Sequence, residues 1–282
     1  MHKSDFLQLP AVSAFVEWFA LQLSKPTYAH AYKTARGKAY TFDGLGAAMQ
    51  QYDWRFKFHD GDGKLWQGTS LAQNQAALDH ITGHLQQALA VGDDEAARIW
   101  STAVMGWGGV MNGNAKWLSE NVDGLAAHIS GVRDILDLQD DADAVLKPIH
   151  RFNAGMTKVY SLLCSRFIIY DSRVAAALAW FVVKWCQETG LQQVPAQLAF
   201  PCLAAKEAAN AGLKKVRNPS VADLRFPALI GASQHAKWNQ RASWVLDAAL
   251  AKAGGTGFGD NLRAVEAALF MWGYDLGSPR SE

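Results

Sequence analysis

Hydrophobic residues recur along most of the chain at helical spacing. Apolar side chains three and four residues apart form one face of an amphipathic helix, so this pattern predicts a mainly α-helical protein. The expected helices span residues 10–24, 70–90, 94–106, 114–137, 156–165, 172–188, 203–210, 235–253 and 261–272. Residues that can cap a helix precede four of these segments, namely Ser70, Asp93, Asp171 and Asp260.

A strand pattern appears at one early place. Apolar and polar residues alternate over residues 55–58 and 64–67, on either side of Asp60-Gly61-Asp62-Gly63. Two short strands joined by an Asp-Gly turn indicate a β-hairpin. The later ligands of a calcium-binding loop are missing, so the turn is not expected to bind calcium. We expect two helical subdomains, residues 1–110 with this small hairpin and residues 111–282, with one compact domain as the alternative.

The composition is that of an ordinary globular chain. Its 282 residues are half hydrophobic, which is enough to bury a full core. With 27 basic and 26 acidic side chains the net charge is +1, so nucleic-acid binding would need a local basic patch. One such patch is the irregular stretch 211–233, which contains Lys214, Lys215 and Arg217. A solvated loop is the simpler interpretation of that stretch.

The N-terminal residues do not have the pattern of a signal peptide or a membrane span. Asp5 and Glu17 interrupt an apolar run that is short and helically periodic. We therefore expect a cytoplasmic protein with no membrane partner. Three cysteines lack metal-ligand spacing and are expected to be buried free thiols, namely Cys164, Cys186 and Cys202.

Familiar catalytic signatures are missing from the sequence. It has no phosphate-binding loop, dinucleotide-binding glycine motif, zinc-protease motif or nucleophile-elbow motif. His80 and His84 lie four residues apart on one predicted helix, as two metal ligands would. No third potential ligand follows from the sequence spacing around these histidines, and a metal site needs three or four ligands. We therefore predict no metal and no cofactor.

Residues 151–174 have the most specific local pattern, which predicts a turn, a helix, a buried extended run and a second helix. Asn153 and Gly155 can supply the positive backbone angles of a tight turn, which places Lys158 in the first turn of the helix. The apolar run 167–170 then crosses the core and delivers Asp171 to the start of the next helix. A surface lysine and a plain helix cap are the simplest interpretations. Neither explains why a glycine turn and a buried run bracket the two residues.

This order of features resembles the helix-hairpin-helix DNA glycosylase superfamily, in which a hairpin, a catalytic lysine and a catalytic aspartate follow one another. The closer similarity is to the bacterial 8-oxoguanine-glycosylase-fold family, over roughly residues 95–276. The stretches that carry it are Asn153-Ala-Gly-Met-Thr-Lys158, Ile169-Tyr-Asp-Ser-Arg-Val174, Ala175-Ala-Ala-Leu178, Trp107-Gly-Gly-Val110 and Glu266-Ala-Ala-Leu-Phe-Met-Trp-Gly-Tyr274. The superfamily hairpin usually has two glycines where this chain has only Gly155, and the Lys158 to Asp171 interval is shorter than usual.

The resemblance implies a DNA glycosylase that flips a modified base, oxidised or hypermodified, out of double-stranded DNA and cleaves its N-glycosidic bond. Its role would be DNA repair or defence against foreign DNA. As the base departs, positive charge builds on the sugar, and Asp171 would be the carboxylate that stabilises it. Lys158 would attack the same carbon and form a Schiff base, which permits strand cleavage. Attack by water, without strand cleavage, stays open.

The resemblance also places other residues at the DNA. Those expected near the backbone phosphates are Asn153, Gly155, Thr157, Arg173, Lys214, Lys215 and Arg217. The candidates for stacking on the flipped base are Trp107, Trp117, Trp238 and Trp244, although each fits a core equally well. Gly108, Gly109, Asn112 and Gly113 would allow close approach of a nucleotide, but a helix end and turn is the favoured interpretation. We expect a monomer.

Two other functions stay open. The chain is alternatively a DNA-binding protein of the same fold that does not cut, with Asp171 acting only as a helix cap. It is alternatively an unrelated all-α enzyme or interaction module. An assay for base release or nicking on oligonucleotides with different modified bases separates the three.

Overall fold

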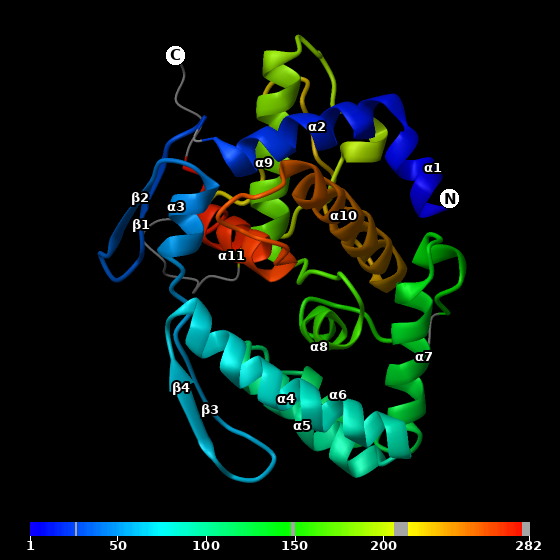
Figure 1. Ribbon diagram of the computed structural model, residues 1–282. Coiled ribbons are helices and arrows are strands. Elements are labelled where there is room, and N and C mark those ends of the chain that lie inside the picture. Colours follow the sequence, from blue (N-terminus) through cyan, green and yellow to red (C-terminus); the bar gives the residue numbers. More distant parts are fainter. Residues whose placement is uncertain (26, 148–149, 206–213, 278–282) are drawn as a thin grey trace. The chain divides into compact units, whose positions relative to one another are not determined.

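The computed structural model is mainly α-helical with two small antiparallel hairpins, which confirms the expected fold class at this level (Figure 1). The structure describes all residues except 26, 148–149, 206–213 and 278–282. The chain forms two compact units, each made of segments that are not consecutive in sequence. Unit 1 comprises Met1–Gln51, Tyr170–Ile230 and Arg241–Glu282, and unit 2 comprises Tyr52–Ile169 and Gly231–Gln240. A single boundary near residue 110 does not describe these units, because the chain leaves unit 1 and returns to it twice.

Unit 2 is a group of helices packed with one hairpin. Its elements are β3 (Phe56–His59), β4 (Leu65–Gly68), α4 (Leu71–Val91), α5 (Asp94–Trp107), α6 (Asn114–Glu120), α7 (Leu125–Asp137), the short 3-10 helix η1 (Ala142–Ala144) and α8 (Met156–Leu163). Helix α5 is central, because it contacts α4, α6, α7, α8 and strand β3. The hairpin lies along α4 and has the register Phe56↔Gly68 to His59↔Leu65 (Figure 1).

The starts of α4 and α5 agree with the sequence prediction. Ser70 accepts a hydrogen bond from the backbone N–H of Gln73 and so caps α4, and Asp93 accepts one from Ala96 and caps α5. The expected helix over 114–137 is wrong, because two helices, α6 and α7, replace it. Gly124, with φ of 76°, interrupts the helical path, and the Asp94 carboxylate accepts the N–H of Gly124 at 2.7 Å.

Unit 1 joins the two ends of the chain. Its elements are α1 (Lys3–Gln8), α2 (Pro10–Ser24), β1 (His30–Lys33), β2 (Ala39–Phe42), α3 (Leu45–Gln50), α9 (Ser172–Glu188), η2 (Ala196–Leu198) and α11 (Leu262–Trp272), with the later part of α10 (Ala232–Ala253). Helix α11 packs against α3 and α9, and α2 packs against α9 (Figure 1). Aromatic rings fill the core between them, with Phe181 5.2 Å from Trp272 and 5.3 Å from Phe19 between ring centroids.

Three parts of unit 1 differ from the expectations. The β1–β2 hairpin, paired from His30↔Phe42 to Lys33↔Ala39, was not expected. Helix α11 is capped by Asn261, whose side chain accepts the N–H of Ala264, and not by Asp260. Residues 203–205 of the expected helix 203–210 are not helical, and 206–210 lie outside the described residues. Over the part of the chain that the structure describes, no helix combines the length and apolar character needed to cross a membrane.

Candidate functional site

Helix α8, which carries Lys158, begins with a turn built on asparagine side chains. The Asn153 Oδ1 accepts the N–H of Gly155 at 2.8 Å and that of Met156 at 2.9 Å. Its Nδ2 donates to Asn114 Oδ1 at 3.0 Å, which connects the turn to α6. The expectation of positive backbone angles here is wrong, since Gly155 has φ of −84° and Asn153 also lies outside the positive region. Glycine is needed because a Cβ at Gly155 would lie 2.1 Å from Asn114 Nδ2.

Lys158 is not a surface lysine, because only 6 % of it is exposed. Its ammonium donates to the carbonyl oxygen of Ala154 at 3.2 Å. Its alkyl chain lies over Gly108, where a Cβ would come within 2.5 Å of Lys158 Cδ. Gly108 and Gly109 are the end of α5 and the turn after it, as favoured from the sequence. The space left by Gly108 is therefore used by the lysine.

Thr157, the neighbour of Lys158, is fully buried. Its hydroxyl donates to the Asn239 side-chain oxygen, and Asn239 Nδ2 donates to the carbonyl of Ile168 at 2.8 Å. The structure thus places Thr157, one of the expected phosphate contacts, in the interior of unit 2. This hydrogen-bonded pair fixes the first turn of α8 and thereby the backbone of Lys158.

Asp171 is the N-cap of α9, as predicted. Its Oδ1 accepts the N–H of Arg173 at 2.9 Å and that of Val174 at 3.1 Å. The preceding run 167–170 is buried, also as predicted, and the hydroxyl of Tyr170 donates to the carbonyl of Pro201 at 2.8 Å. Asp171 therefore has a fixed backbone and a fixed side chain. It belongs to unit 1, whereas Lys158 belongs to unit 2.

Cations gather in unit 1 around the ring of Tyr274. The guanidinium carbon of Arg173 lies 4.9 Å from the centroid of that ring and 4.1 Å from that of Phe270. The Lys215 ammonium lies 5.4 Å from the Tyr274 ring, and the Arg217 guanidinium 6.0 Å. We call Arg173, Lys215, Arg217 and Tyr274 the cation cluster. Basic groups held beside an aromatic ring are suited to binding nucleic-acid phosphates and bases.

Arg217 is a buried member of this cluster and not part of a solvated loop. Its Nε donates to the carbonyl of Tyr274 at 3.0 Å, and its Nη1 donates to the hydroxyl of Ser172. Burial and, to a smaller extent, the charge of Arg173 together lower its pKa to about 10, while the charge of Asp171 opposes the shift. The carboxylate of Asp171 and the guanidinium of Arg217 thus act on each other. By contrast, Lys214 is exposed.

Close approach of two helices positions the cation cluster. A Cβ at Gly273, which ends α11, would lie 1.9 Å from the carbonyl oxygen of Arg173 in the first turn of α9. Only glycine permits this contact, because the obstacle is backbone. The glycine in the stretch 266–274 therefore holds Tyr274 beside Arg173.

The four candidate tryptophans do not form one group. Trp107, Trp117 and Trp238 belong to unit 2 and Trp244 to unit 1. Trp107 is buried, and its Nε1 donates to Asn74 Oδ1 at 2.7 Å. Trp238 and Trp244 are buried as well, and Trp117 is half-buried beneath the guanidinium of Arg151, 5.0 Å away.

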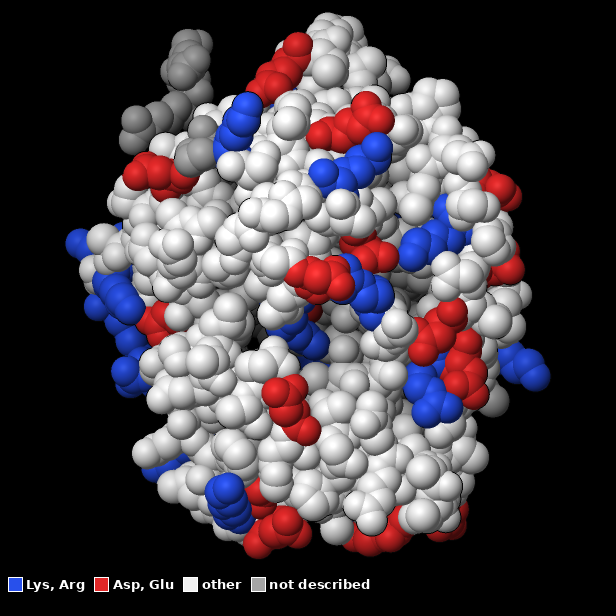
Figure 2. Space-filling model, viewed as in Figure 1, with Lys and Arg blue, Asp and Glu red and all other residues white. Residues whose placement is uncertain are grey.

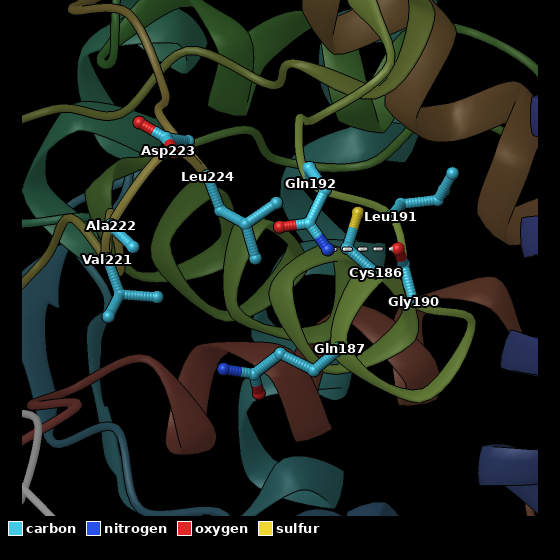
Figure 3. Close-up of a pocket in the computed structure, with 9 residues that line it drawn as sticks. All are labelled: Cys186, Gln187, Gly190, Leu191, Gln192, Val221, Ala222, Asp223 and Leu224. Atoms are coloured by element: carbon cyan, nitrogen blue, oxygen red, sulfur yellow. Dashed lines mark hydrogen bonds between the residues drawn. The ribbon is translucent and has the colours of Figure 1, made fainter.

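Two cavities of unit 1 lie elsewhere. One of about 260 Å³ lies between the end of α9 and residues 221–224, with Cys186 and Leu224 in its wall (Figure 3). The amide of Gln192 donates to the carbonyl of Gly190 at 3.2 Å beside it. A second cavity of about 240 Å³ lies beside α3. Both are below the roughly 300–1,000 Å³ of ordinary ligand pockets, and neither is lined by a residue expected at the DNA.

The three cysteines are free thiols, as predicted. Cys186 and Cys202 are buried, and burial raises their pKa to about 11 and about 12. Cys164 is half-buried, and its pKa is also raised, mainly by burial. A thiol that stays protonated is a poor nucleophile and a poor metal ligand, so none of the three has the character of a reactive cysteine.

The sequence missed one acidic partner of His80 and His84. The structure brings Asp62, on the turn between β3 and β4, to these two histidines, with one ligand atom of each within 4.8 Å of the others. Spacing could not reveal this partner, because Asp62 lies on a different element from the histidines. The Asp-Gly pair that predicts the turn is the signal that could have placed it near α4.

Comparisons with protein-family models, with curated proteins and with solved structures find no match for this chain. Acidic and basic side chains are interspersed over the visible face, so this face has no general basic field (Figure 2). Chemically, the described residues offer a buried lysine in unit 2, and in unit 1 a rigid carboxylate beside a cation cluster.

Proposed function

We propose that the protein is a DNA glycosylase of the helix-hairpin-helix type that excises a modified base, oxidised or hypermodified, from double-stranded DNA. The observation that carries the proposal is the burial of Lys158 in the first turn of α8. Removing a lysine from water has a cost, and an amine sheltered from water is the kind of group that forms a Schiff base with a sugar. The segment 151–174, which contains Lys158, also contains Asp171, and such an enzyme requires a carboxylate.

The proposed role of Asp171 is to stabilise the positive charge that develops on the sugar. A carboxylate that need not reorganise during the reaction stabilises a transition state best. The two backbone N–H groups that bind its Oδ1 supply this rigidity. The cation cluster would neutralise phosphates, with Lys215 and Arg173 as its more accessible members.

The test is base release from duplex oligonucleotides that carry 8-oxoguanine or a hypermodified pyrimidine, measured by mass spectrometry of the free base. Borohydride added during turnover reduces a Schiff base and traps a covalent protein–DNA adduct. We expect the adduct with the unaltered protein and with Lys116→Gln, a control at an exposed lysine of α6, and no adduct with Lys158→Gln.

Each result has a defined meaning. Base release without an adduct assigns the attack to water and removes the nucleophilic role of Lys158. DNA binding without release of any base favours the non-catalytic DNA-binding protein. Absence of both binding and release overturns the proposal.

A further inference from the structure

Three side chains of unit 2 converge where the β3–β4 turn meets α4. They are Asp62, His80 and His84, and one ligand atom of each lies within 4.8 Å of the others. The two histidines lie one helical turn apart, so both project from the same side of α4. We propose that these residues bind a divalent transition-metal ion of the zinc class. This site is independent of the proposed DNA chemistry.

The position of Asp62 is fixed by the turn around it. Gly61 lies so close to α5 that a Cβ there would be 2.6 Å from Ile99 Cγ2 and 3.0 Å from the Trp100 ring. The Asp60 carboxylate accepts the backbone N–H of Asp62 at 3.0 Å and that of Lys64 at 2.9 Å. The turn is therefore held against α5 on one side and braced from within, which brings Asp62 to the histidines.

His80 has the partner that metal-bound histidines usually have. Its Nε2 lies 3.1 Å from Asp60 Oδ2, a carboxylate oxygen that also accepts the Trp66 indole N–H at 2.7 Å. Because the carboxylate is an acceptor, the Nε2 of His80 donates to it, and a neutral ring then has its lone pair on Nδ1. A carboxylate behind a histidine in this way orients the ring and strengthens it as a ligand.

Aromatic rings restrict both histidines. The ring of His84 stacks on Trp100 with 4.1 Å between centroids and 9° between planes. The ring of His80 lies 5.0 Å from Trp66 and 5.5 Å from Trp100. Histidine rings held by neighbouring aromatic rings lose less freedom on binding a metal than free ones would.

The donor set indicates which ion would bind. Two imidazoles and one carboxylate suit zinc, whereas calcium and magnesium prefer oxygen ligands throughout, and copper(I) prefers sulfur. Metal–ligand distances near 2.0–2.2 Å in a tetrahedron separate ligand atoms by about 3.3–3.6 Å. Asp62 is exposed, so a rotation of its side chain toward the histidines would reduce this difference. Three protein ligands leave one position for water.

The experiment is zinc titration of the full chain, freed of any histidine tag and stripped of metal with a chelator. We expect one zinc ion per chain with a Kd of about 1 µM or tighter, and a Co²⁺ absorption spectrum typical of four-coordinate nitrogen and oxygen ligands. His84→Ala should weaken zinc binding at least 100-fold, and Asp60→Asn about 10–100-fold. Asp79→Asn, at an exposed carboxylate of the same helix, is the control and should bind as the unaltered protein does.

Equal zinc affinity in the unaltered protein and His84→Ala overturns the site, and so does the absence of binding below about 100 µM zinc. Circular dichroism checks that each variant is folded. If His84→Ala does not fold, Asp62→Asn replaces it, because this exposed turn residue lies outside the core. Since the readout is zinc alone, failure of the site leaves the DNA proposal untouched, and failure of the DNA proposal leaves the site untouched.

Discussion

Asp171→Asn separates the two roles that a carboxylate can have at the start of α9. The amide oxygen of asparagine can still accept the N–H groups that Oδ1 accepts at 2.9 and 3.1 Å. Asparagine caps helices about as well as aspartate does, so the cap is kept. What is lost is the negative charge, which acts on the helix end and on the guanidinium of Arg217. That loss costs about 0.3–1 kcal/mol of stability, which in a chain of this size lowers Tm by only a few degrees.

The same change removes the proposed transition-state stabilisation. Loss of one preorganised electrostatic group typically lowers kcat about 10²–10³-fold, or roughly 3–4 kcal/mol. The assay is the single-turnover rate of base release at saturating protein, with DNA affinity measured separately. We expect a large fall in rate and nearly unchanged binding.

Asp93→Asn is the matched control, because Asp93 caps α5 through the same kind of side-chain bond, to the N–H of Ala96 at 2.9 Å. It should lose a similar small amount of stability and keep full activity. A rate within about threefold of the unaltered protein in Asp171→Asn would refute the catalytic role. An equal fall in both variants would show that capping, and not charge beside the sugar, is what matters.

Three further changes test other parts of the structure. Replacing Lys214 and Lys215 with alanine should flatten the slope of log K against log salt by up to about two phosphate contacts, each near −0.9, with little change in the cleavage rate. Gly273→Ala places a Cβ 1.9 Å from a backbone oxygen of α9 and should lower the free energy of unfolding by about 3 kcal/mol or more, measured by urea denaturation. Burial, with a smaller effect from the charge of His150, lowers the pKa of His128 from 6.5. The unfolded chain therefore takes up this proton first as pH falls, so stability declines below about pH 6.5, and His128→Gln should reduce that decline.

Each of these results has a contrary outcome. An unchanged salt slope would show that the two lysines are merely solvated. Gly46→Ala, where nothing lies within 4 Å, is the control for Gly273 and should leave stability unchanged or slightly higher. Equal urea midpoints for Gly273→Ala and the unaltered protein would contradict the close helix contact. An identical pH dependence in His128→Gln would assign the acid sensitivity to other groups.

Long amphipathic helices and their caps could be predicted from the sequence, because periodicity and cap chemistry are local. Helices α2 and α9 begin and end at the expected residues, and Asp171 caps α9. Helices α1 and α3 are six residues long, too short for a period to emerge. Strands β1 and β2 are equally short, and they are stabilised by contacts with distant residues, such as the stacking of Tyr32 on Tyr274 at 4.8 Å.

In the candidate site too, some features follow from the local sequence and others depend on contacts with distant residues. Lys158 and Asp171 were found from local pattern, whereas the burial of Lys158 depends on Gly108 in another helix. Arg217 was expected near DNA phosphates, with a solvated loop as the simpler interpretation of its stretch, and the structure shows it bound to Ser172 and to the carbonyl of Tyr274. A count of charges along the chain cannot distinguish a buried cation from a solvated one.

The pairing of α3 with α11 has a consequence for biosynthesis. These helices pack against each other within unit 1, yet one is made near the start of the chain and the other near its end. At about 5–20 residues per second, α3 waits on the order of 10–40 s before its partner is translated. Unit 2, whose main segment is continuous over Tyr52–Ile169, can acquire most of its contacts on the ribosome. The N-terminal helices must keep their apolar faces from aggregating during that interval, so we expect production of the protein to depend on chaperones that bind nascent chains.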